Sequence, residues 1–462
     1  MKLEIQQIAA MTGGRIFPPA ARATVSGVST DSRTIRPGDL FVPLRGPSFD
    51  GHDFLAEAVH RGAAACLSED VIAGFPVPVV GVANTLTALG DLAAGLRRGF
   101  AGPLLAVTGS SGKTTTKDML AAILSLDAPG LMTQGNYNNL IGLPLTLCQL
   151  APEHHWVVLE MGMSARGEIA RLAEIAAPTI GIITNIGPAH LEELLTLEGV
   201  ARAKGELFAA LPAGGTAVIN ADDERVTALP VANGVDRLFY GLAATATVRG
   251  EELAPQGKGL SFTLHLPEGA QRVNLAVPGR HNVSNALAAA AAAHALGIPG
   301  AVIVRGLERF RPRAGRLEVV PLADDVLLFD DSYNANPLSV KAALGTLAES
   351  GGGRKIAVLG DMLELGSQAP ALHREVGAAA AGVDGLVVLG KFAADLAAGA
   401  REAGLAPAKI RLATDHAEAL AILREWLAPG ARILVKGSRG MRMETISAGL
   451  RGAGTCPRAG NC

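Results

Sequence analysis

From residue 104 onward, short apolar runs alternate with longer stretches in which apolar residues recur at helical spacing. The apolar runs are rich in Val, Ile and Leu and lie at 104–107, 156–160, 180–185 and 216–220. Such alternation predicts a parallel, doubly wound sheet with helices on both faces. Between residues 245 and 277 the period changes to two, most clearly at 260–266, which predicts antiparallel strands that extend the sheet.

The same α/β rhythm begins again near residue 313, and a smaller pattern stands at the N-terminus. The apolar runs of the last segment lie at 326–330, 355–359, 386–389 and 433–436, and those of the first at 39–43 and 78–82. Because a domain typically holds about 100–200 residues, a chain of 462 residues suggests roughly three. We therefore expect an α/β protein of three domains, at residues 1–100, 101–312 and 313–462. The first is small, the second contains the parallel sheet and the third is Rossmann-like.

Composition narrows the functional class. Apolar residues make up 49% of the chain and charged residues 18%, so the chain can bury several cores. The net charge of −2 gives no reason to expect binding to nucleic acid or to an acidic membrane surface. The N-terminus lacks the apolar core of a signal peptide, and no apolar run reaches the roughly 20 residues of a membrane-spanning helix. A cytoplasmic protein without membrane insertion is therefore expected.

The cysteines agree with that expectation. They are Cys66, Cys148, Cys456 and Cys462, and no two form a Cys-x-x-Cys pair, which disfavours a zinc site. A reduced compartment is the simplest account of all four.

The strongest chemical signal is the glycine-rich loop Thr108-Gly-Ser-Ser-Gly-Lys-Thr-Thr115, which stands between an apolar run and a predicted helix at 113–126. Backbone N–H groups of such a loop converge with a helix N-terminus on one point, where they favour an anion. In a phosphate-binding loop Lys113 reaches the β- and γ-phosphates, and Thr114 offers its hydroxyl to Mg²⁺. The common form of the loop has a glycine where this chain has Val107, so the fit is imperfect. An ordinary strand-to-helix turn is the alternative.

Other polar residues follow predicted strands, at the sheet edge where α/β proteins bind ligands. Glu160 can bind Mg²⁺ or orient water, and His190 can face the same site; a surface carboxylate and a structural histidine are the alternatives. Residues 330–337 suit contacts to ribose, a metal or an ammonium group, or form an Asx-rich turn. Lys436 begins a segment that suits a carboxylate or phosphate, or is a plain basic turn.

Two further residues have simpler interpretations on pattern alone. Asn282, together with Ser284, can cap the Ala-rich helix that follows, and a contact to adenine from Asn282 or Asn285 is the alternative. Lys204 is typical of a solvated charge on a helix.

Together these residues resemble the Mur ligases of peptidoglycan synthesis, and the resemblance extends along almost the whole chain. Its N-terminal motifs are Thr30-Asp-Ser-Arg33 and residues 36–46 and 50–54. The further motifs, in the family's order, are 108–115, 135–142, 160–162, 189–192, 279–282, 315–318, 330–337, 360–366 and 435–439. Each motif is a weak to moderate signal alone, but the ordered set is very specific. The loop at 108–115 matches the family's own variant, which accounts for Val107.

The resemblance implies a task for each domain. Residues 1–100 would bind the UDP-sugar, residues 101–312 would form a P-loop ATPase-like domain, and residues 313–462 would bring the amine and close the site against water. ATP and two Mg²⁺ ions are the implied cofactors. Catalytic roles would fall to Lys113, His190, Lys204 and Arg316. Lys204 matches the lysine that is carbamylated in the family, which reverses its interpretation from pattern alone.

The resemblance also implies binding residues. Those for ATP are Gly109, Ser110, Ser111, Gly112, Lys113, Thr114, Thr115, Asn282 and Asp331, with Asn282 near adenine and Asp331 at the ribose. Those for magnesium are Thr114, Glu160 and His190. Those for the peptide substrates are Thr30, Ser32, Arg33, Asn139, Lys436 and Ser438.

The dipeptide-adding branch of the family is the nearest match, on residues 331–336 and 360–366. In its reaction ATP phosphorylates the terminal carboxylate of UDP-MurNAc-tripeptide, and the amine of D-Ala-D-Ala attacks the acyl phosphate. No protein nucleophile is needed, in agreement with the lack of a convincing Ser-His or Cys-His arrangement. A monomer acting on these two substrates is expected. The sequence does not distinguish lysine from diaminopimelate in the tripeptide.

Three alternatives remain. One is a sister ligase that adds a single amino acid or extends folate with glutamate, although the Asp-Asn-Pro-Arg signature of diaminopimelate-adding ligases is absent. Another is a GTP-dependent switch, which would need Asn-Lys-x-Asp where this chain has Thr184-Asn-Ile-Gly187. A nucleotide kinase is the third, but it would not explain the N-terminal segment.

Overall fold

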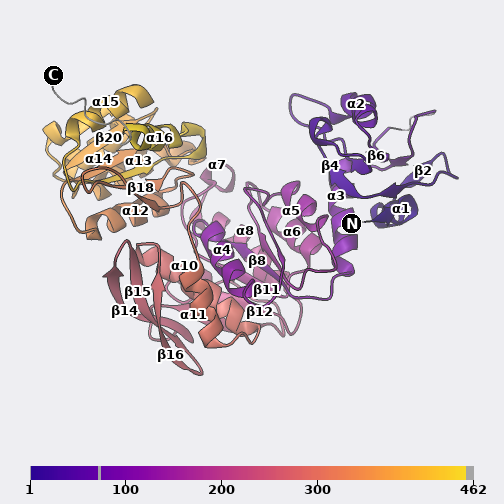
Figure 1. Ribbon diagram of the computed structural model, residues 1–462, viewed down its shortest axis with the longest axis horizontal. Coiled ribbons are helices and arrows are strands. Elements are labelled where there is room, and N and C mark those ends of the chain that lie inside the picture. Colours follow the sequence, from indigo (N-terminus) through magenta and orange to yellow (C-terminus); the bar gives the residue numbers. More distant parts are fainter. Residues whose placement is uncertain (1, 71–73, 454–462) are drawn as a thin grey trace, which may run out of the picture.

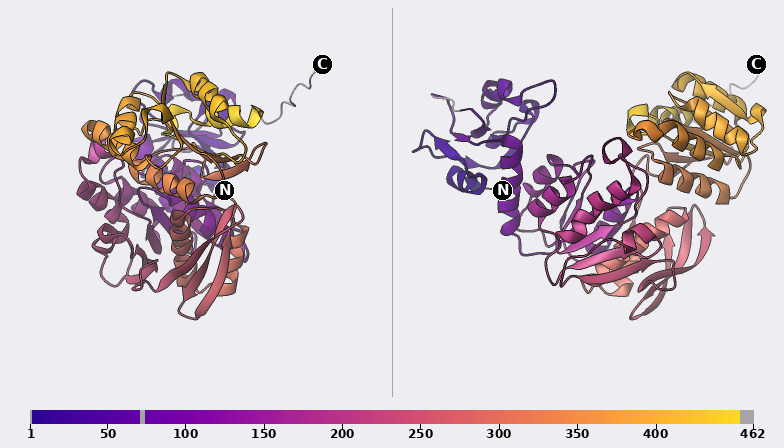
Figure 2. Two further views of the ribbon diagram at one scale, coloured as in Figure 1. Left: turned by 90° about the vertical axis from the view of Figure 1, so that its left-hand side faces the viewer. Right: turned by 180° about the vertical axis from the view of Figure 1, so that it is seen from behind.

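The computed structural model describes residues 2–70 and 74–453. Its strands form three main sheets that follow one another along the chain, with a two-stranded pair beside the first. Figure 1 shows the N-terminal and C-terminal sheets at opposite ends of the molecule, with the central sheet between them, and Figure 2 shows the same arrangement from behind. The α/β class expected from the sequence is confirmed, whereas the domain boundaries stay a prediction.

The N-terminal sheet has the strand order β2-β7-β6-β5-β4, with all neighbours parallel except β2 and β7. Its strands are β2 (Arg15–Phe17), β4 (Gly27–Ser29), β5 (Asp39–Phe41), β6 (Ala65–Ser68) and β7 (Val79–Gly81), and β1 (Leu3–Glu4) pairs with β3 (Thr24–Val25). The helices are α1 (Ile5–Thr12), η1 (Ser32–Thr34), η2 (Gly51–Phe54), α2 (Leu55–His60) and α3 (Thr85–Arg98). Helix α3 contacts both α1 and helices of the central sheet, so it joins the two parts.

The central sheet has the order β16-β15-β14-β13-β12-β11-β8-β10-β9. Its strands are β8 (Leu104–Thr108), β9 (Leu131–Met132), β10 (Val157–Glu160), β11 (Ile180–Ile183), β12 (Thr216–Asn220), β13 (Asp236–Gly241), β14 (Val248–Gln256), β15 (Gly259–Leu266) and β16 (Gly269–Leu275). The last three pair antiparallel, which confirms the expected extension. The helices are α4 (Lys113–Leu124), α5 (Gly142–Leu147), α6 (Glu168–Ala176), α7 (Leu191–Leu194), α8 (Leu197–Ala209), α9 (Glu224–Thr227), α10 (Arg280–Ala295) and α11 (Gly300–Arg309).

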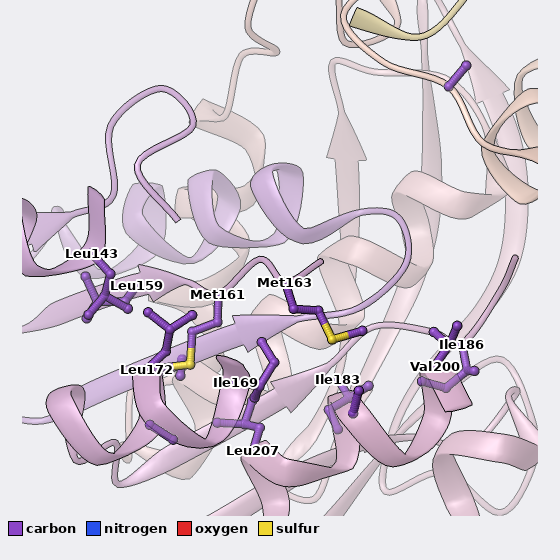
Figure 3. Packing of buried hydrophobic residues seen from close by; sticks show 14 of the residues in the cluster. Leu143, Leu159, Met161, Met163, Ile169, Leu172, Ile183, Ile186, Val200 and Leu207 are labelled. Atoms are coloured by element: carbon purple, nitrogen blue, oxygen red, sulfur yellow. The ribbon is translucent and has the colours of Figure 1, made fainter. Parts of the chain in front are cut away.

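Alternate residues of β8 show how helices cover both faces of the central sheet. Leu104 and Ala106 belong to the apolar cluster that includes α3, α6 and α8, whereas Leu105 and Val107 pack with α4, α10 and α11. Because side chains alternate across a strand, an uninterrupted apolar run requires burial on both faces. Figure 3 shows part of the first cluster, which extends from Leu143 to residues near the end of β11.

The C-terminal sheet has the order β17-β18-β22-β19-β20-β21 and is parallel except for β17. Its strands are β17 (Glu318–Pro321), β18 (Leu327–Asp331), β19 (Lys355–Leu359), β20 (Gly385–Leu389), β21 (Ile410–Ala413) and β22 (Arg432–Lys436). The helices are α12 (Pro337–Glu349), η3 (Gly366–Gln368), α13 (Ala369–Ala379), α14 (Ala393–Glu402), η4 (Pro407–Lys409), α15 (His416–Trp426), η5 (Arg439–Met441) and α16 (Glu444–Ala453). Helices α12 to α14 pack on one face, and α15 and α16 on the other.

Two sequence expectations concern features outside the sheets. In residues 2–70 and 74–453, no helix combines the length and apolar character that crossing a membrane requires. Cys66 and Cys148 are free and buried, and burial raises the pKa of each thiol to about 12. Cys456 and Cys462 lie outside the described residues.

Candidate active site

The glycine-rich loop joins β8 to α4 at the carboxyl edge of the central sheet. Gly109 and Gly112 have φ angles of +145° and +80°, in the region that favours glycine. A Cβ on Gly109 would lie 1.9 Å from Thr184 Oγ1, and one on Gly112 would lie 2.2 Å from Asn285 Oδ1. The loop therefore leaves no room for side chains at either position. It delivers the backbone to the start of α4, where the first N–H groups have no partner within the helix.

Lys113 and Thr114, the first residues of α4, turn toward neighbouring polar groups. Lys113 Nζ donates to the carbonyl of Gly109 at 2.8 Å, and burial lowers the pKa of its ammonium while Glu160 opposes that shift. Thr114 Oγ1 donates to Glu160 Oε2 at 2.7 Å. Both side chains thus lie at the loop, as the phosphate-binding interpretation requires.

Glu160 is the last residue of β10, which pairs parallel with β8, so its carboxylate stands beside the loop. It is buried, and its second oxygen accepts from Asn138 Nδ2 at 2.8 Å. No cluster of three or more His, Cys, Asp or Glu side chains suited to a metal occurs in the described residues. One carboxylate with an adjacent hydroxyl nevertheless fits Mg²⁺, which commonly takes one or two protein ligands and completes its shell with water and phosphate oxygens. Asn138 lies in the motif at 135–142, but no pattern in the sequence distinguishes it from the other residues of that motif.

A cavity of about 830 Å³ opens at this point, between the central and C-terminal sheets. Many of the predicted residues line it: Ser110, Ser111, Gly112, Lys113, Thr114, Thr115, Asn139, Glu160, His190, Asn282, Arg316, Asp331 and Lys436. Asn285, named from the sequence as an alternative contact to adenine, also lines the cavity. Other lining residues were not predicted, among them Asn138, His281 and Glu364. The side chain of Asn336 ties the two sheets together here, because its Nδ2 donates to the carbonyl of Ser110 at 3.0 Å.

His190 lies just before α7, with a φ angle of +55°. Its Nδ1 is 2.7 Å from Oε2 of Glu364, which belongs to the C-terminal part of the chain. The contact lowers the pKa of the Glu364 carboxyl. The structure thus brings His190 to the cavity wall together with an acidic partner that sequence reasoning missed.

Lys204 lies in α8 and does not line the cavity. It is only 1% exposed, so its interpretation as a solvated helix charge is wrong. Burial, with a smaller contribution from nearby Lys113, brings the pKa of its ammonium well below the usual range. Within the described residues its amine has no hydrogen bond or ion pair, which is unusual for a buried lysine. Its surroundings therefore favour the neutral amine.

Three residues of the C-terminal part were predicted to contact the ribose or a carboxylate: Asp331, Lys436 and Ser438. Each already has a hydrogen-bond partner within the protein. Lys436 Nζ is 2.5 Å from Asp331 Oδ2 and 2.9 Å from the carbonyl of Asn334. The hydroxyl of Ser438 is buried, accepts from the Leu363 N–H at 2.9 Å and donates to the carbonyl of Ala335 at 3.2 Å. Lys436 and Ser438 thus brace the segment at 330–337, and a substrate contact from either requires an exchange of partners.

Arg316 and Asn282 face the cavity from opposite sheets. The Arg316 guanidinium lies over the Tyr333 ring, 4.1 Å from its centre. Helix α10 begins at Arg280 with Gly279 as its N-cap, so the interpretation of Asn282 as a cap is wrong. Asn282 Nδ2 donates to the carbonyl of Pro278 at 2.8 Å, and its Oδ1 accepts from Asn285 at 3.2 Å.

Asn139 has a structural partner as well: its Oδ1 accepts from the N–H groups of Ile141 and Gly142, at the start of α5.

The predicted N-terminal substrate residues stand apart from this cavity. Thr30, Ser32 and Arg33 lie at β4 and η1, in the sheet at the far end of the molecule (Figures 1 and 2). Ser32 Oγ donates to Glu57 at 3.2 Å, and Arg33 pairs with Asp31 at 2.7 Å. A ligand that contacts both places must be long.

A phosphate loop that opens into a cavity between two α/β sheets defines the class, a multidomain P-loop protein. Three family models match the chain: "Mur ligase family, catalytic domain" at residues 24–97, "Mur ligase middle domain" at 107–293, and "Mur ligase, glutamate ligase domain" at 315–439. The chain is 41% identical to UDP-N-acetylmuramoyl-tripeptide–D-alanyl-D-alanine ligase of Escherichia coli (strain K12), over 94% of this chain and 96% of that one. The chain therefore belongs to the Mur ligase family.

Solved structures are similar to this chain over almost its whole length. MurF from Acinetobacter baumannii matches with a TM-score of 0.92 and 36% identity, covering 98% of this chain and 99% of that one. MurF ligase from Thermotoga maritima, solved in complex with ADP, matches with a TM-score of 0.84 and 29% identity, covering 93% and 97%.

Proposed function

We propose that this chain ligates D-Ala-D-Ala to UDP-MurNAc-tripeptide, with ATP converted to ADP and phosphate, in the cytoplasm and as a monomer. The observation that supports this most is the cavity in which the phosphate loop, Glu160 and the C-terminal sheet meet. The naming of the Escherichia coli relative supports the choice of substrates. The motif at 360–366, characteristic of the dipeptide-adding branch, contributes Glu364 to the cavity.

In the proposed reaction the γ-phosphate of ATP passes to the terminal carboxylate of the tripeptide, and the dipeptide amine displaces phosphate from the acyl phosphate. The loop from Gly109 to Gly112 would hold the phosphates by backbone N–H groups, and Lys113 would neutralise the transferring group. Arg316, which faces the loop from the other sheet, would add a second positive charge. Catalysis of this kind rests on positioning and charge, without a protein nucleophile.

Thr114, Glu160 and His190 would hold magnesium, which when bound neutralises phosphate charge and orients the transferring group. Lys204 would be carbamylated: its neutral amine adds to carbon dioxide, forming an N–C bond and releasing one proton. The burial and lack of partners of Lys204 support this assignment, because only the neutral amine is a nucleophile. The carbamate would replace a buried neutral amine with an anion beside Lys113.

Substrate binding would be divided among three domains, with boundaries near residues 1–100, 101–312 and 313–462. Thr30, Ser32 and Arg33 would bind the UDP-sugar at the far sheet, and the peptide would extend to Asn139 and the cavity. Asn282 would lie near adenine and Asp331 at the ribose. Lys436 and Ser438 would receive the dipeptide carboxylate after exchanging their present partners.

Phosphate release from ATP and Mg²⁺ tests the function directly. We expect release only when UDP-MurNAc-tripeptide and D-Ala-D-Ala are both present, with a UDP-pentapeptide as the product by mass. Parallel assays with the lysine and the diaminopimelate tripeptide identify the third residue. Release with a single amino acid in place of the dipeptide would move the chain to a sister ligase. Nucleotide binding without ligation in any pairing would overturn the proposal.

A further inference from the structure

The loop that follows β19 crosses from the C-terminal sheet to the central domain. The Glu192 N–H donates to the Glu364 carbonyl at 3.3 Å, and Gln368 Nε2 donates to the Leu195 carbonyl at 3.0 Å. Gly366 packs closely against helix α7, since a Cβ at this position would lie 3.1 Å from Glu192 Cα. These contacts with α7 and with its C-cap residue, Leu195, hold the loop at several points.

Glu364 is the side chain that this loop delivers to the cavity. Its backbone adopts φ of +63°, an uncommon conformation for a residue with a side chain, and its Oε2 lies 2.7 Å from His190 Nδ1. A carboxylate so close to a ring nitrogen requires that nitrogen to carry the proton. In the neutral imidazole the other nitrogen, Nε2, then holds the free lone pair.

We propose that Glu364 is a positioning residue for magnesium: it fixes the ring and tautomer of His190 so that Nε2 is available to the metal. This inference rests on the proposed function, which makes His190 a metal ligand. A carboxylate that orients a ligating histidine through its other nitrogen is a recurring feature of metal sites. Here the carboxylate comes from a different domain than His190, Glu160 and Thr114. The metal site is therefore complete only when the C-terminal sheet is docked on the central domain. Because the C-terminal part also brings the dipeptide, phosphoryl transfer would be coupled to its docking.

Metal affinity measured on the full chain tests the inference apart from activity. Mn²⁺ serves as the probe, because free and bound Mn²⁺ are distinguished by electron paramagnetic resonance, and ADP is kept at one saturating concentration. The variants are Glu364→Ala, Glu364→Gln, His190→Ala and the double variant Glu364→Ala with His190→Ala. Glu193→Gln is the matched control, since Glu193 is an exposed carboxylate on the neighbouring helix α7. Thermal unfolding of each variant verifies that it is folded.

We expect Glu364→Ala to weaken Mn²⁺ binding by about 10-fold or more, as removal of an orienting partner typically does. Glu364→Gln should lose less, because an amide oxygen still accepts from Nδ1–H. In the His190→Ala background the Glu364 substitution should change the affinity less than twofold, since its effect passes through His190. The control should bind Mn²⁺ as the unaltered protein does.

Two outcomes would overturn the inference. Unchanged Mn²⁺ affinity in Glu364→Ala means that the carboxylate does not serve the metal site. An equal loss in the presence and absence of His190 means that Glu364 acts by holding the domains together or by touching the metal itself. The proposed function fails separately, if the unaltered protein binds Mn²⁺ and ADP but ligates nothing.

Discussion

At Glu160, one buried carboxylate accepts hydrogen bonds from both Thr114 and Asn138, so its charge organises the edge of the phosphate loop. Replacing it with glutamine keeps the shape and removes the charge that magnesium needs. We expect Glu160→Gln to lower kcat by about 10²–10³-fold, the range found when one preorganised electrostatic group is removed. Phosphate release measured against Mg²⁺ concentration checks this. Glu153→Gln, the same change at an exposed carboxylate, should leave the rate unchanged.

His281 lies at the cavity wall near Asp331 and Lys436. Burial lowers the pKa of His281 from its ordinary value of 6.5 to about 4, although Asp331 opposes the shift. Between these pH values the unfolded chain binds a proton that the folded chain does not, so stability falls as the pH drops from 6.5 toward 4. Because His281 is partly exposed, we expect a loss of about 1–2 kcal/mol, less than the full shift implies.

Urea unfolding at pH 7 and pH 5 measures this dependence. His281→Gln removes the titrating group, so the difference in unfolding free energy between the two pH values should shrink. An identical difference in both proteins would show that other groups carry the acid sensitivity.

Among the elements, the turn that leads into α4 restricts the choice of residue most strictly. Gly112 combines a φ of +80° with a neighbour, Asn285 Oδ1, that would stand 2.2 Å from a new Cβ. We expect Gly112→Ala to displace the loop and weaken ADP binding at least 10-fold. Gly135→Ala is the control, because φ there is +55° but nothing lies within 4 Å of the added Cβ. Calorimetric titration measures the affinity of both variants for ADP. Equal losses would reflect the cost of positive φ that both share, whereas a loss in Gly112→Ala alone would reflect displacement of the phosphate loop.

Elements with strong periodicity could be predicted from the sequence, and the contacts between them could not. Strands β12 and β19 have the predicted bounds, because both are apolar runs ended by turn residues. Strand β13 (Asp236–Gly241) is missed by the apolar pattern because its first two residues, Asp236 and Arg237, are charged and exposed. The cap assigned to Asn282 failed because α10 begins earlier, after a glycine.

In the candidate site, too, local features could be predicted from the sequence and contacts between distant segments could not. Lys113 and Thr114 could be placed because the spacing of a phosphate loop is local in sequence. The partnership of His190 with Glu364 could not, because it joins two domains across a long separation in sequence. The burial of Lys204 was hidden for a related reason: a helix pattern does not show which of its charges the rest of the fold covers.

For the whole molecule, one ion pair links the phosphate-loop helix to the segment that leads into the C-terminal sheet. Arg313 Nε and Nη2 lie 2.7 and 3.0 Å from the two carboxylate oxygens of Asp118, in α4. Asp118 also pairs with Lys117, which is fully buried. Removing Arg313 therefore leaves Asp118 with a partner, and loosens only the connection to the C-terminal sheet.

A half-buried pair of this kind contributes about 1 kcal/mol, which corresponds to roughly a fivefold change in the ratio of docked to undocked molecules. We expect Arg313→Ala to raise the KM for D-Ala-D-Ala about fivefold and to increase the average radius of gyration in X-ray scattering. Arg311→Ala is the control, because Arg311 donates to the carbonyls of Glu308 and Phe310 on its own segment. If both variants behave alike, the position of the C-terminal sheet does not depend on the pair. A larger radius without a change in KM would separate domain docking from dipeptide binding, because the pair would then hold the sheet in place without serving the dipeptide.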